Sequence, residues 1–337
     1  MFFGKTKNYL VADIGGTKST LAIIDDKYLV KVKKVYLSAE ITHFTETVNN
    51  FLKEPECKKY TVREASLAVA GPINENRTYA KLTNASWDVD VDDIIRHTPL
   101  QKVFLINDFE AVGFSVDTLK QEQYTELTNL GSNTAGTIVV IGAGTGLGVS
   151  ILPYYKKKHV PLASEGGHVD LPILSDDSID VKLESFLIKK KLYKSAEDVV
   201  SGRGIANIYS FLLTQKIKHS EKIRREIAKA KMTERPAMIT RHALEGKDAL
   251  CLMTVELFVK YYAKMARNLA LSTLCTELVI AGGIAPKILS ILQDMFVEEF
   301  TQHSIEDIRK IVEQTSVIVL TDPDISLYGA LNALNYS

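Results

Sequence analysis

The chain has 337 residues, 46% of them hydrophobic, which is enough for one large or two medium globular domains. Lysine plus arginine and aspartate plus glutamate each number 41, so the formal net charge is zero and gives no reason to expect nucleic acid or an anionic membrane as a partner. The three cysteines lack CxxC spacing, which argues against a disulfide framework or a structural zinc site. With no signal-peptide pattern and no apolar run of about 20 residues, we expect a cytoplasmic globular protein.

Strand and helix patterns alternate along the chain. Short apolar runs bounded by glycine or charged residues predict strands at 9–13, 21–24, 65–70, 102–106, 137–141, 149–152, 278–281 and 316–320. Apolar residues at three- and four-residue spacing predict helices at 42–53, 91–97, 178–190, 204–215, 220–231 and 249–274. The last helix has apolar residues outside its main stripe, which predicts a buried or interface helix. The alternation indicates an α/β protein.

A strand, glycine turn and strand occur twice in the same order. Residues 11–23 align with residues 139–151 at a constant offset of 128 (139 − 11), which keeps Gly16 with Gly144 and Thr17 with Thr145. Chance similarity between two glycine turns is the alternative explanation. A true duplication predicts two related lobes that face one cleft.

Three glycine-rich turns follow predicted strands, at residues 13–18, 142–148 and 281–284. Consecutive backbone N–H groups in such turns can hold an anion because glycine has no Cβ in the way, and a nearby threonine hydroxyl adds a donor. A single glycine turn is usually only a turn, but three in these positions favour a polyphosphate site. The second turn does not fit G-x-G-x-x-G and leads into a strand, so a Rossmann cofactor site is disfavoured.

Asn107 and Asp108 directly follow the predicted strand at 102–106 and precede a predicted helix start. A carboxylate at the carboxyl end of such a strand projects toward the crevice where ligands bind in open α/β sheets. Asp108 is therefore a candidate base. A simple helix cap is the alternative role for this residue.

Three further features carry polar groups of the kind that bind a sugar. Glu165-Gly-Gly-His168 has the pattern of a loop that presents two side chains, although a plain turn with a solvated glutamate also explains it. Glu197 on its own is typical of a helix surface. Asn84 and Trp87 combine an amide with an aromatic wall, and the alternative for Trp87 is a place in the core.

Together these motifs resemble those of bacterial-type glucokinases in the actin-like sugar kinase superfamily. The resemblance covers almost the whole chain in the family's order, and its most specific parts are Ile106-Asn-Asp-Phe109 and Glu165-Gly-Gly-His168. It implies two ribonuclease-H-like lobes with a ligand cleft between them, a small one at 1–115 joined by a C-terminal helix at 324–337 and a large one at 116–323. It also implies a homodimer that phosphorylates glucose at the 6-hydroxyl group with ATP, the first step of glycolysis.

The resemblance implies a role for individual residues. Asp108 is the expected catalytic base and Asp13 is expected to position Mg²⁺ through ATP. The sugar is expected to contact Asn107, Asp108, Glu165, His168 and Glu197, with Asn84 added from its place near Trp87. The phosphates are expected to contact Asp13, Gly15, Gly16, Thr17, Lys18, Gly142, Gly144, Thr145 and Gly146, and the adenosine Gly282 and Gly283.

Two positions depart from the family pattern. Lys18 stands where many members have asparagine and Arg203 where many have proline, and we expect both to affect affinity more than activity. No cysteine follows His168 before Cys251, so neither the zinc-containing branch of related sugar kinases nor structural zinc is expected. The open alternatives are a kinase for another hexose, an amino sugar or acetate, ADP or polyphosphate as donor, a non-catalytic sugar sensor, and an actin- or chaperone-like ATPase.

Overall fold

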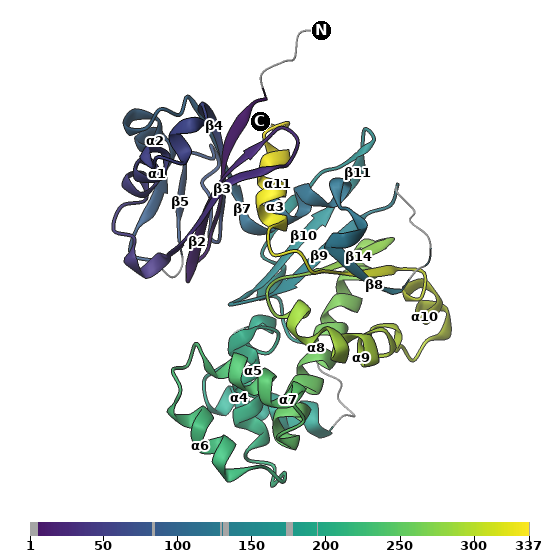
Figure 1. The fold of residues 1–337 in the computed structure, drawn as a ribbon. Helices are drawn as coiled ribbons and strands as arrows, with labels where there is room; N and C mark the ends of the chain where they lie inside the picture. Colours follow the sequence, from purple (N-terminus) through teal and green to yellow (C-terminus); the bar gives the residue numbers. More distant parts are fainter. Residues whose placement is uncertain are drawn as a thin grey trace. The chain divides into compact units, whose positions relative to one another are not determined.

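The computed structural model describes residues 6–82, 85–128, 130, 135–172, 178–193 and 195–336. Strands and helices alternate along the chain, which confirms the predicted α/β class (Figure 1). The chain divides into two compact units, one of Met1–Leu119, Lys158–Ala163 and Asp322–Ser337 and one of Lys120–Lys157 and Ser164–Thr321. The domain boundaries expected above stay a prediction, because compactness alone does not define an independent domain. Across the described ranges, no helix combines the length and apolar character that crossing a membrane requires.

The first unit is built on a five-stranded sheet in the order β3-β2-β1-β4-β7. β1 pairs antiparallel with β2 and parallel with β4, and β4 pairs parallel with β7. Its strands are β1 (Asn8–Ile14), β2 (Lys18–Asp25), β3 (Val30–Leu37), β4 (Val62–Val69) and β7 (Lys102–Asn107). A small separate sheet pairs β5 (Tyr79–Lys81) with β6 (Asp88–Asp90).

Helices cover both faces of the first sheet (Figure 1). They are α1 (Phe44–Lys53), α2 (Val91–His97), α3 (Asp108–Ser115) and α11 (Ile325–Ala333). Leu10, Ala12 and Ile14 of β1 lie in one core with α1 and α2, whereas Val11 lies in a second core with α3 and α11. Because successive residues of a strand point to opposite faces and both faces are buried, β1 has a nearly continuous apolar sequence.

The second unit repeats the strand arrangement of the first. β9 pairs antiparallel with β10 and parallel with β14, and β14 pairs parallel with β15, so the six-stranded order is β13-β10-β9-β14-β15-β8, with β8 as an additional strand relative to the first sheet. The bounds are β8 (Tyr124–Thr128), β9 (Ile138–Ala143), β10 (Leu147–Leu152), β14 (Glu277–Ala281) and β15 (Ser316–Leu320). Short strands β11 (Tyr154–Tyr155), β12 (Lys158–His159) and β13 (Leu162–Ser164) follow β10 along the chain.

The two predicted hairpins are present, but their turns differ in length. Residues 15–18 separate the last pair of the first hairpin, Ile14 and Ser19, whereas residues 144–146 separate Ala143 and Leu147 in the second. A constant offset of 128 therefore aligns the two hairpins in sequence, but it does not align their pairing. It places Ile14 and Ser19, which pair with each other, on residues 142 and 147, whereas residue 142 pairs with residue 148. The duplication is a repeat of topology with a shorter second turn.

The helix α8 (Ala249–Thr273) runs through the main core of the second unit, which confirms that it is buried. Its Tyr262 hydroxyl donates to the Ile141 carbonyl of β9 at 3.0 Å. Its Lys264 forms a fully buried ion pair with Asp180, which attaches α8 to the neighbouring helix α4. The other helices are α4 (Ser178–Lys189), α5 (Gly202–Leu212), α6 (Glu221–Lys229), α7 (Arg235–Leu244), α9 (Leu289–Thr301) and α10 (Glu306–Val312).

Several elements were not predicted, among them β3 and β8. β3 has the sequence VKVKKVYL at the edge of the first sheet, and it interrupts the apolar residues with exposed lysines. Such lysines are typical of edge strands, where they discourage pairing with another chain. β8 lies at the edge of the second sheet and is equally poor in fully buried residues. The helices α7, α9, α10 and α11 were not expected at their observed bounds, although a C-terminal helix was.

Candidate active site

The end of β7 places Asn107 and Asp108 at the start of α3. Asn107 is the N-cap, and its side-chain oxygen accepts from the backbone N–H of Phe109 at 2.9 Å. Glu110 accepts from the backbone N–H of Asn107 at 3.0 Å, which completes a capping box. The cap considered as an alternative role for Asp108 is thus supplied by Asn107, and Asp108 is the half-buried first residue of the helix.

An ion pair holds this corner in place. Glu110 is only 4% exposed, and its two oxygens accept from the guanidinium of Arg77 at 2.8 and 3.0 Å. Arg77 also donates to the Leu105 carbonyl of β7 at 3.3 Å. Such two-pronged contacts between a guanidinium and a carboxylate are among the stronger hydrogen bonds in proteins and also set orientation. The backbone that carries Asp108 is therefore well constrained.

Asp13 lies near the carboxyl end of β1, on the same edge of the sheet as the end of β7. Burial is the largest cause that raises the pKa of Asp108 to about 7, and the negative charge of Asp13 adds to it. Hydrogen bonds from the Phe109 N–H and from the Asn107 side chain act in the opposite direction and lower the pKa. Burial also raises the pKa of Asp13 itself; a hydrogen bond from the Ser326 hydroxyl at 2.5 Å opposes this rise and the charge of Asp324 adds to it. The first unit thus holds two carboxyl groups whose charged forms disfavour each other.

The turn between β1 and β2 carries the first group of predicted phosphate contacts. The Gly15 N–H donates to the Lys18 carbonyl at 3.0 Å, and the Ser38 hydroxyl donates to the Gly15 carbonyl at 2.6 Å. Thr17 and Lys18 are exposed. The turn therefore has a fixed backbone and presents a hydroxyl donor and a cation, both of which suit an anion.

In the second unit, two of the predicted nucleotide turns adjoin each other. β9 and β14 are parallel neighbours in which Ala281 pairs with Gly142, so the turns that follow them lie at the same edge of the sheet. The Ile284 N–H donates to the Ala143 carbonyl at 3.3 Å and joins the turns directly. Thr145, Gly282 and Gly283 are exposed there. The arrangement suits a ligand that carries phosphates at one end.

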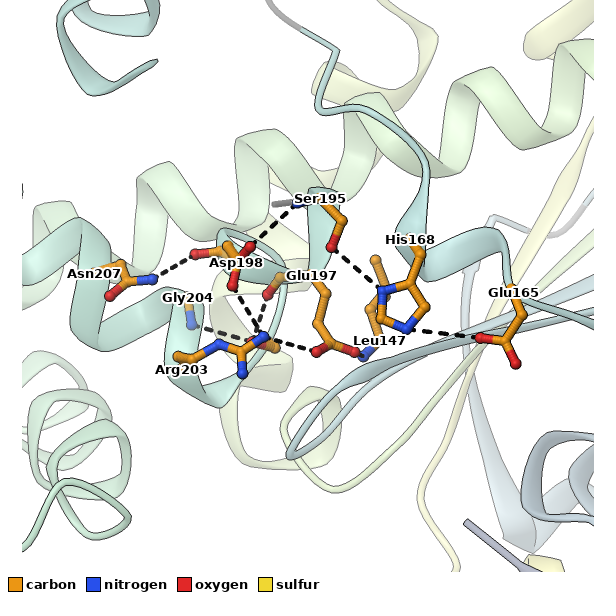
Figure 2. A network of polar contacts seen from close by, with 10 residues as sticks. Leu147, Glu165, His168, Ser195, Glu197, Asp198, Arg203, Gly204 and Asn207 are labelled. Carbon is orange, nitrogen blue, oxygen red and sulfur yellow. Dashed lines mark hydrogen bonds and ion pairs between the residues drawn. The ribbon is translucent and has the colours of Figure 1, made fainter. Parts of the chain in front are cut away.

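The Glu165-Gly-Gly-His168 loop folds into a single 3₁₀ turn, η5 (Gly166–His168), as Figure 2 shows. The imidazole Nε2 of His168 lies 3.6 Å from a carboxylate oxygen of Glu165, and its Nδ1 lies 3.4 Å from the Ser195 hydroxyl. Glu165 and His168 are both exposed. The loop therefore presents a carboxylate and an imidazole side by side, as the sequence predicted, and both can hydrogen-bond to a hydroxyl group.

Glu197 lies in a second 3₁₀ turn, η6 (Ala196–Asp198), next to this loop (Figure 2). The Ala196 N–H donates to the Val169 carbonyl at 2.8 Å, which attaches η6 to the end of the loop. One Glu197 oxygen accepts from the backbone N–H of Leu147 at 3.0 Å, beside the second glycine turn. The structure thus brings Glu197 close to the predicted phosphate turn and to the loop of His168, rather than leaving it on an open helix surface.

Of the predicted pair Asn84 and Trp87, the structure describes only Trp87. Trp87 is buried, stacks on Phe44 with ring centroids 5.3 Å apart, and donates from its indole N–H to the Ser38 carbonyl at 2.9 Å. It is therefore a core residue of the first unit and not an exposed sugar wall. Asn84 lies outside the described residues.

Four residues that had no predicted role in the site contact the candidate residues or one another: Arg77, Glu110, Ser326 and Arg203. Glu110 follows Asn107 by three positions, the capping-box spacing, so this contact was readable from the sequence. In the sequence, Arg203 stands out only as a departure from the family pattern. Arg77 and Ser326 had no local signal, because each meets its partner only in the folded chain.

Among the residues that the structure describes, no three histidine, cysteine, aspartate or glutamate side chains gather to hold a metal ion. Mg²⁺ does not need such a cluster, because it is commonly held by one or two carboxylates together with substrate phosphates and water. Asp13 and Asp108 are oxygen donors of this kind.

The chain matches one protein family along almost its full length. The family model described as Glucokinase matches residues 10–336. A glucokinase from Nostoc punctiforme is 34% identical over 338 residues, covering 95% of this chain and 97% of the relative.

Solved structures give a consistent result. A glucokinase from an Antarctic psychrotroph has a TM-score of 0.79 at 29% identity and covers 98% of this chain and 99% of that protein. A ROK family glucokinase from Streptomyces griseus, in complex with glucose and AMPPNP, has a TM-score of 0.67 at 13% identity, covers 98% of this chain and 100% of that protein, and shows likeness of fold alone. These likenesses confirm the predicted actin-like fold with two lobes.

Proposed function

The chain belongs to the glucokinase family, and we propose that it transfers the γ-phosphoryl group of ATP to the 6-hydroxyl group of glucose with Asp108 as the catalytic base. The phosphorylation of glucose follows from the family, whose model spans residues 10–336. The complex of the Streptomyces griseus relative with glucose and AMPPNP supports ATP as the donor. The observation that supports Asp108 as the base is its raised pKa at a constrained strand end.

The raised pKa of Asp108 supports its proposed role as a general base. A general base works best when its pKa lies near the operating pH, because it is then ionised and still basic enough to accept a proton. The pKa of Asp108 is about 7. In the proposed step, its carboxylate accepts the hydroxyl proton of glucose as that oxygen bonds to the γ-phosphorus, and the bond from this phosphorus to the departing ADP oxygen breaks.

We assign the remaining sugar hydroxyls to Asn107, Glu165, His168 and Glu197, with Asn84 as a further candidate. A sugar removed from water needs a paired donor or acceptor for each hydroxyl group, and a site with such partners rejects analogues that leave one of them unpaired. The exposed Glu165 and His168 and the neighbouring Glu197 supply carboxylate and imidazole groups within one small region. Asn107 uses its carbonyl oxygen at the helix cap, which leaves its NH₂ group to orient Asp108 or a hydroxyl.

We assign the phosphates to the two hairpin turns. Gly15, Gly16, Thr17 and Lys18 form the first of these turns. Gly142, Gly144, Thr145 and Gly146 form the second, and the exposed Gly282 and Gly283 beside it suit the adenosine. Phosphoryl transfer depends mainly on positioning and on stabilisation of charge, which backbone N–H groups and a lysine provide.

Mg²⁺ fits the donors of the first unit. Burial raises the pKa of both Asp13 and Asp108, and the charge of Asp13 raises the pKa of Asp108 further. A divalent cation beside them would relieve this repulsion. We propose that Asp13 holds Mg²⁺ together with the ATP phosphates. The bound ion would neutralise part of the phosphate charge. Ser326 keeps the Asp13 carboxylate in place through its hydrogen bond.

Release of ADP tests the activity and the base together. With Mg-ATP, glucose is expected to give a higher kcat/KM than mannose, an amino sugar or acetate. Asp108→Asn is expected to lower kcat roughly 100-fold or more, because the amide cannot take the proton, while calorimetry finds glucose binding within about threefold of the wild type. Asp92→Asn, the same change at an exposed position of α2, is the control and is expected to retain full turnover.

Other results of these assays would support a different base, a different substrate or a different function. Near-normal turnover by Asp108→Asn removes this residue from its role as base. Faster turnover with another acceptor transfers the activity to that substrate. Glucose binding by the wild type without release of ADP identifies a non-catalytic sensor, and ATPase activity indifferent to sugar identifies an ATPase module.

A further inference from the structure

Arg203 is the second residue of α5, and it bridges two carboxylates (Figure 2). Its Nη2 lies 2.8 Å from Glu197 Oε1 and 2.9 Å from Asp198 Oδ1. The Arg203 side chain is 54% exposed, but those of Glu197 and Asp198 are only 17% and 4% exposed. A cation in the first turn of a helix opposes the helix dipole. These two contacts, and not the helix itself, therefore account for an arginine at this position.

Glu197 is held from two directions. Its Oε2 accepts from the Leu147 N–H at 3.0 Å, while its Oε1 accepts from Arg203. A Cβ at Gly146 would lie only 2.5 Å from Oε2, so a glycine there lets the carboxylate lie directly against the turn. A carboxylate oxygen accepts more than one hydrogen bond, and Oε1 can therefore bind Arg203 and a hydroxyl donor at the same time.

We propose that Arg203 is a positioning residue of the sugar site, which holds Glu197 in one orientation so that Oε1 can accept a hydrogen bond from a glucose hydroxyl. This inference rests on the proposed function, in which Glu197 contacts glucose. A planar guanidinium fixes the direction as well as the charge of its partner. Because Glu197 is ordered before glucose arrives, binding does not have to supply the free energy of ordering it.

A second arginine of the same unit provides a contrast. Arg241 pairs with Glu226 at 3.1 Å, and their side chains are 53% and 42% exposed. Water screens such a pair, which typically contributes little. Arg203 is just as exposed, but its partners are shielded and one of them contacts the predicted phosphate turn. Removing Arg203 should therefore raise the KM for glucose, whereas removing Arg241 should not.

Steady-state kinetics with glucose and Mg-ATP test the proposal. Arg203→Ala is expected to raise the KM for glucose about tenfold, because Glu197 loses its fixed orientation. The kcat and the KM for ATP are expected to stay within about twofold, since Arg203 pairs with Glu197 and Asp198 and not with Asp108 or Asp13. The KM for glucose of Arg203→Lys is expected to lie between those of the wild type and Arg203→Ala, because an ammonium restores the charge without the planar geometry. Arg241→Ala is the matched control and is expected to leave all three constants within about twofold.

A double variant separates action through Glu197 from a merely structural role. If Arg203 acts through Glu197, the KM for glucose of Arg203→Ala combined with Glu197→Gln should equal that of Glu197→Gln alone. Multiplication of the two effects would overturn the proposal, as would a KM for Arg203→Ala that is unchanged or lower than that of the wild type. Failure of the wild type to release ADP with glucose would instead overturn the proposed function, and it is seen before any variant is compared.

Discussion

Asp108 lies where the folded chain stabilises its protonated form. Burial is the largest cause of its raised pKa, and the charge of Asp13 adds to it. Both effects are absent from the unfolded chain, in which the carboxyl group titrates near its ordinary value of 3.8. Between about pH 4 and pH 7 the folded protein therefore keeps a proton that the unfolded chain has lost, and its free energy of unfolding falls as the pH rises.

This linkage predicts that Asp108→Asn stabilises the protein, and more so at higher pH. Asparagine carries no charge, so the variant avoids the cost that the wild type incurs when Asp108 ionises in the folded state. The melting temperature of the variant minus that of the wild type is expected to increase by about 2 °C or more between pH 5 and pH 8. Thermal unfolding in EDTA measures this difference. A difference that does not change with pH would contradict the raised pKa of Asp108.

At the scale of elements, the contact of α11 with α3 supports the site. An added Cβ on Gly329 of α11 would lie 1.6 Å from the Ala111 carbonyl oxygen of α3, which no small side-chain movement can relieve. The two helices are far apart in sequence, yet α3 begins at Asp108 and its placement depends on how α11 packs against it. A glycine in a helix usually destabilises it, and here close packing explains its presence.

Gly329→Ala is accordingly expected to destabilise the protein by about 1–3 kcal/mol, although alanine favours a helix more than glycine does. The overlap with Ala111 must push α11 away from α3. Urea unfolding followed by circular dichroism measures the change. Gly283→Ala adds the same methyl group where no atom lies within 4 Å and is the steric control, with an expected change within about 0.5 kcal/mol. Equal stability of both variants would contradict the close packing described here.

At the scale of the whole molecule, the two units share a strand order but have separate cores. The core of the second unit contains β9, β10, β14 and α8, whereas the first unit has one core on each face of its sheet. Asp13 and Asp108, proposed for the metal and the proton, belong to the first unit. Asn107, proposed for a sugar hydroxyl, also belongs to the first unit, whereas Glu165, His168 and Glu197, likewise proposed for the sugar, belong to the second.

This division of roles predicts that metal removal separates chemistry from sugar binding. EDTA is expected to lower phosphoryl transfer more than about 100-fold, because the phosphate charge loses its counter-ion. Glucose at about 100 times its Kd should still stabilise the protein by about 2.7 kcal/mol, since Glu165, His168 and Glu197 are proposed to bind the sugar without contacting the metal. ADP release and thermal unfolding in the same buffers measure the two effects, and added Mg²⁺ should restore turnover. Loss of the glucose effect in EDTA would place the metal in the sugar site.

Much of the fold was predictable because it depends on neighbours in sequence. Apolar runs that end at glycine identified the central strands of both sheets, and the spacing of apolar residues identified α2 and α8 nearly to the residue. The edge strand β3 was missed because a strand with one solvated edge has a weaker apolar pattern. Trp87 shows the limit for single residues, since composition cannot distinguish a buried indole from a sugar-binding one.

By itself, the sequence determined the α/β class, the repeated hairpins, the family resemblance and Asp108 as the candidate base, because each of these is recorded in short local patterns. Only the tertiary structure decided that Arg203 pairs with Glu197 and Asp198, that Ser326 holds Asp13, and that burial raises the pKa of Asp108 to about 7. The physical reason is that hydrogen bonding and desolvation depend on which groups meet in space. Residues that are distant in sequence meet only when the strands and helices pack.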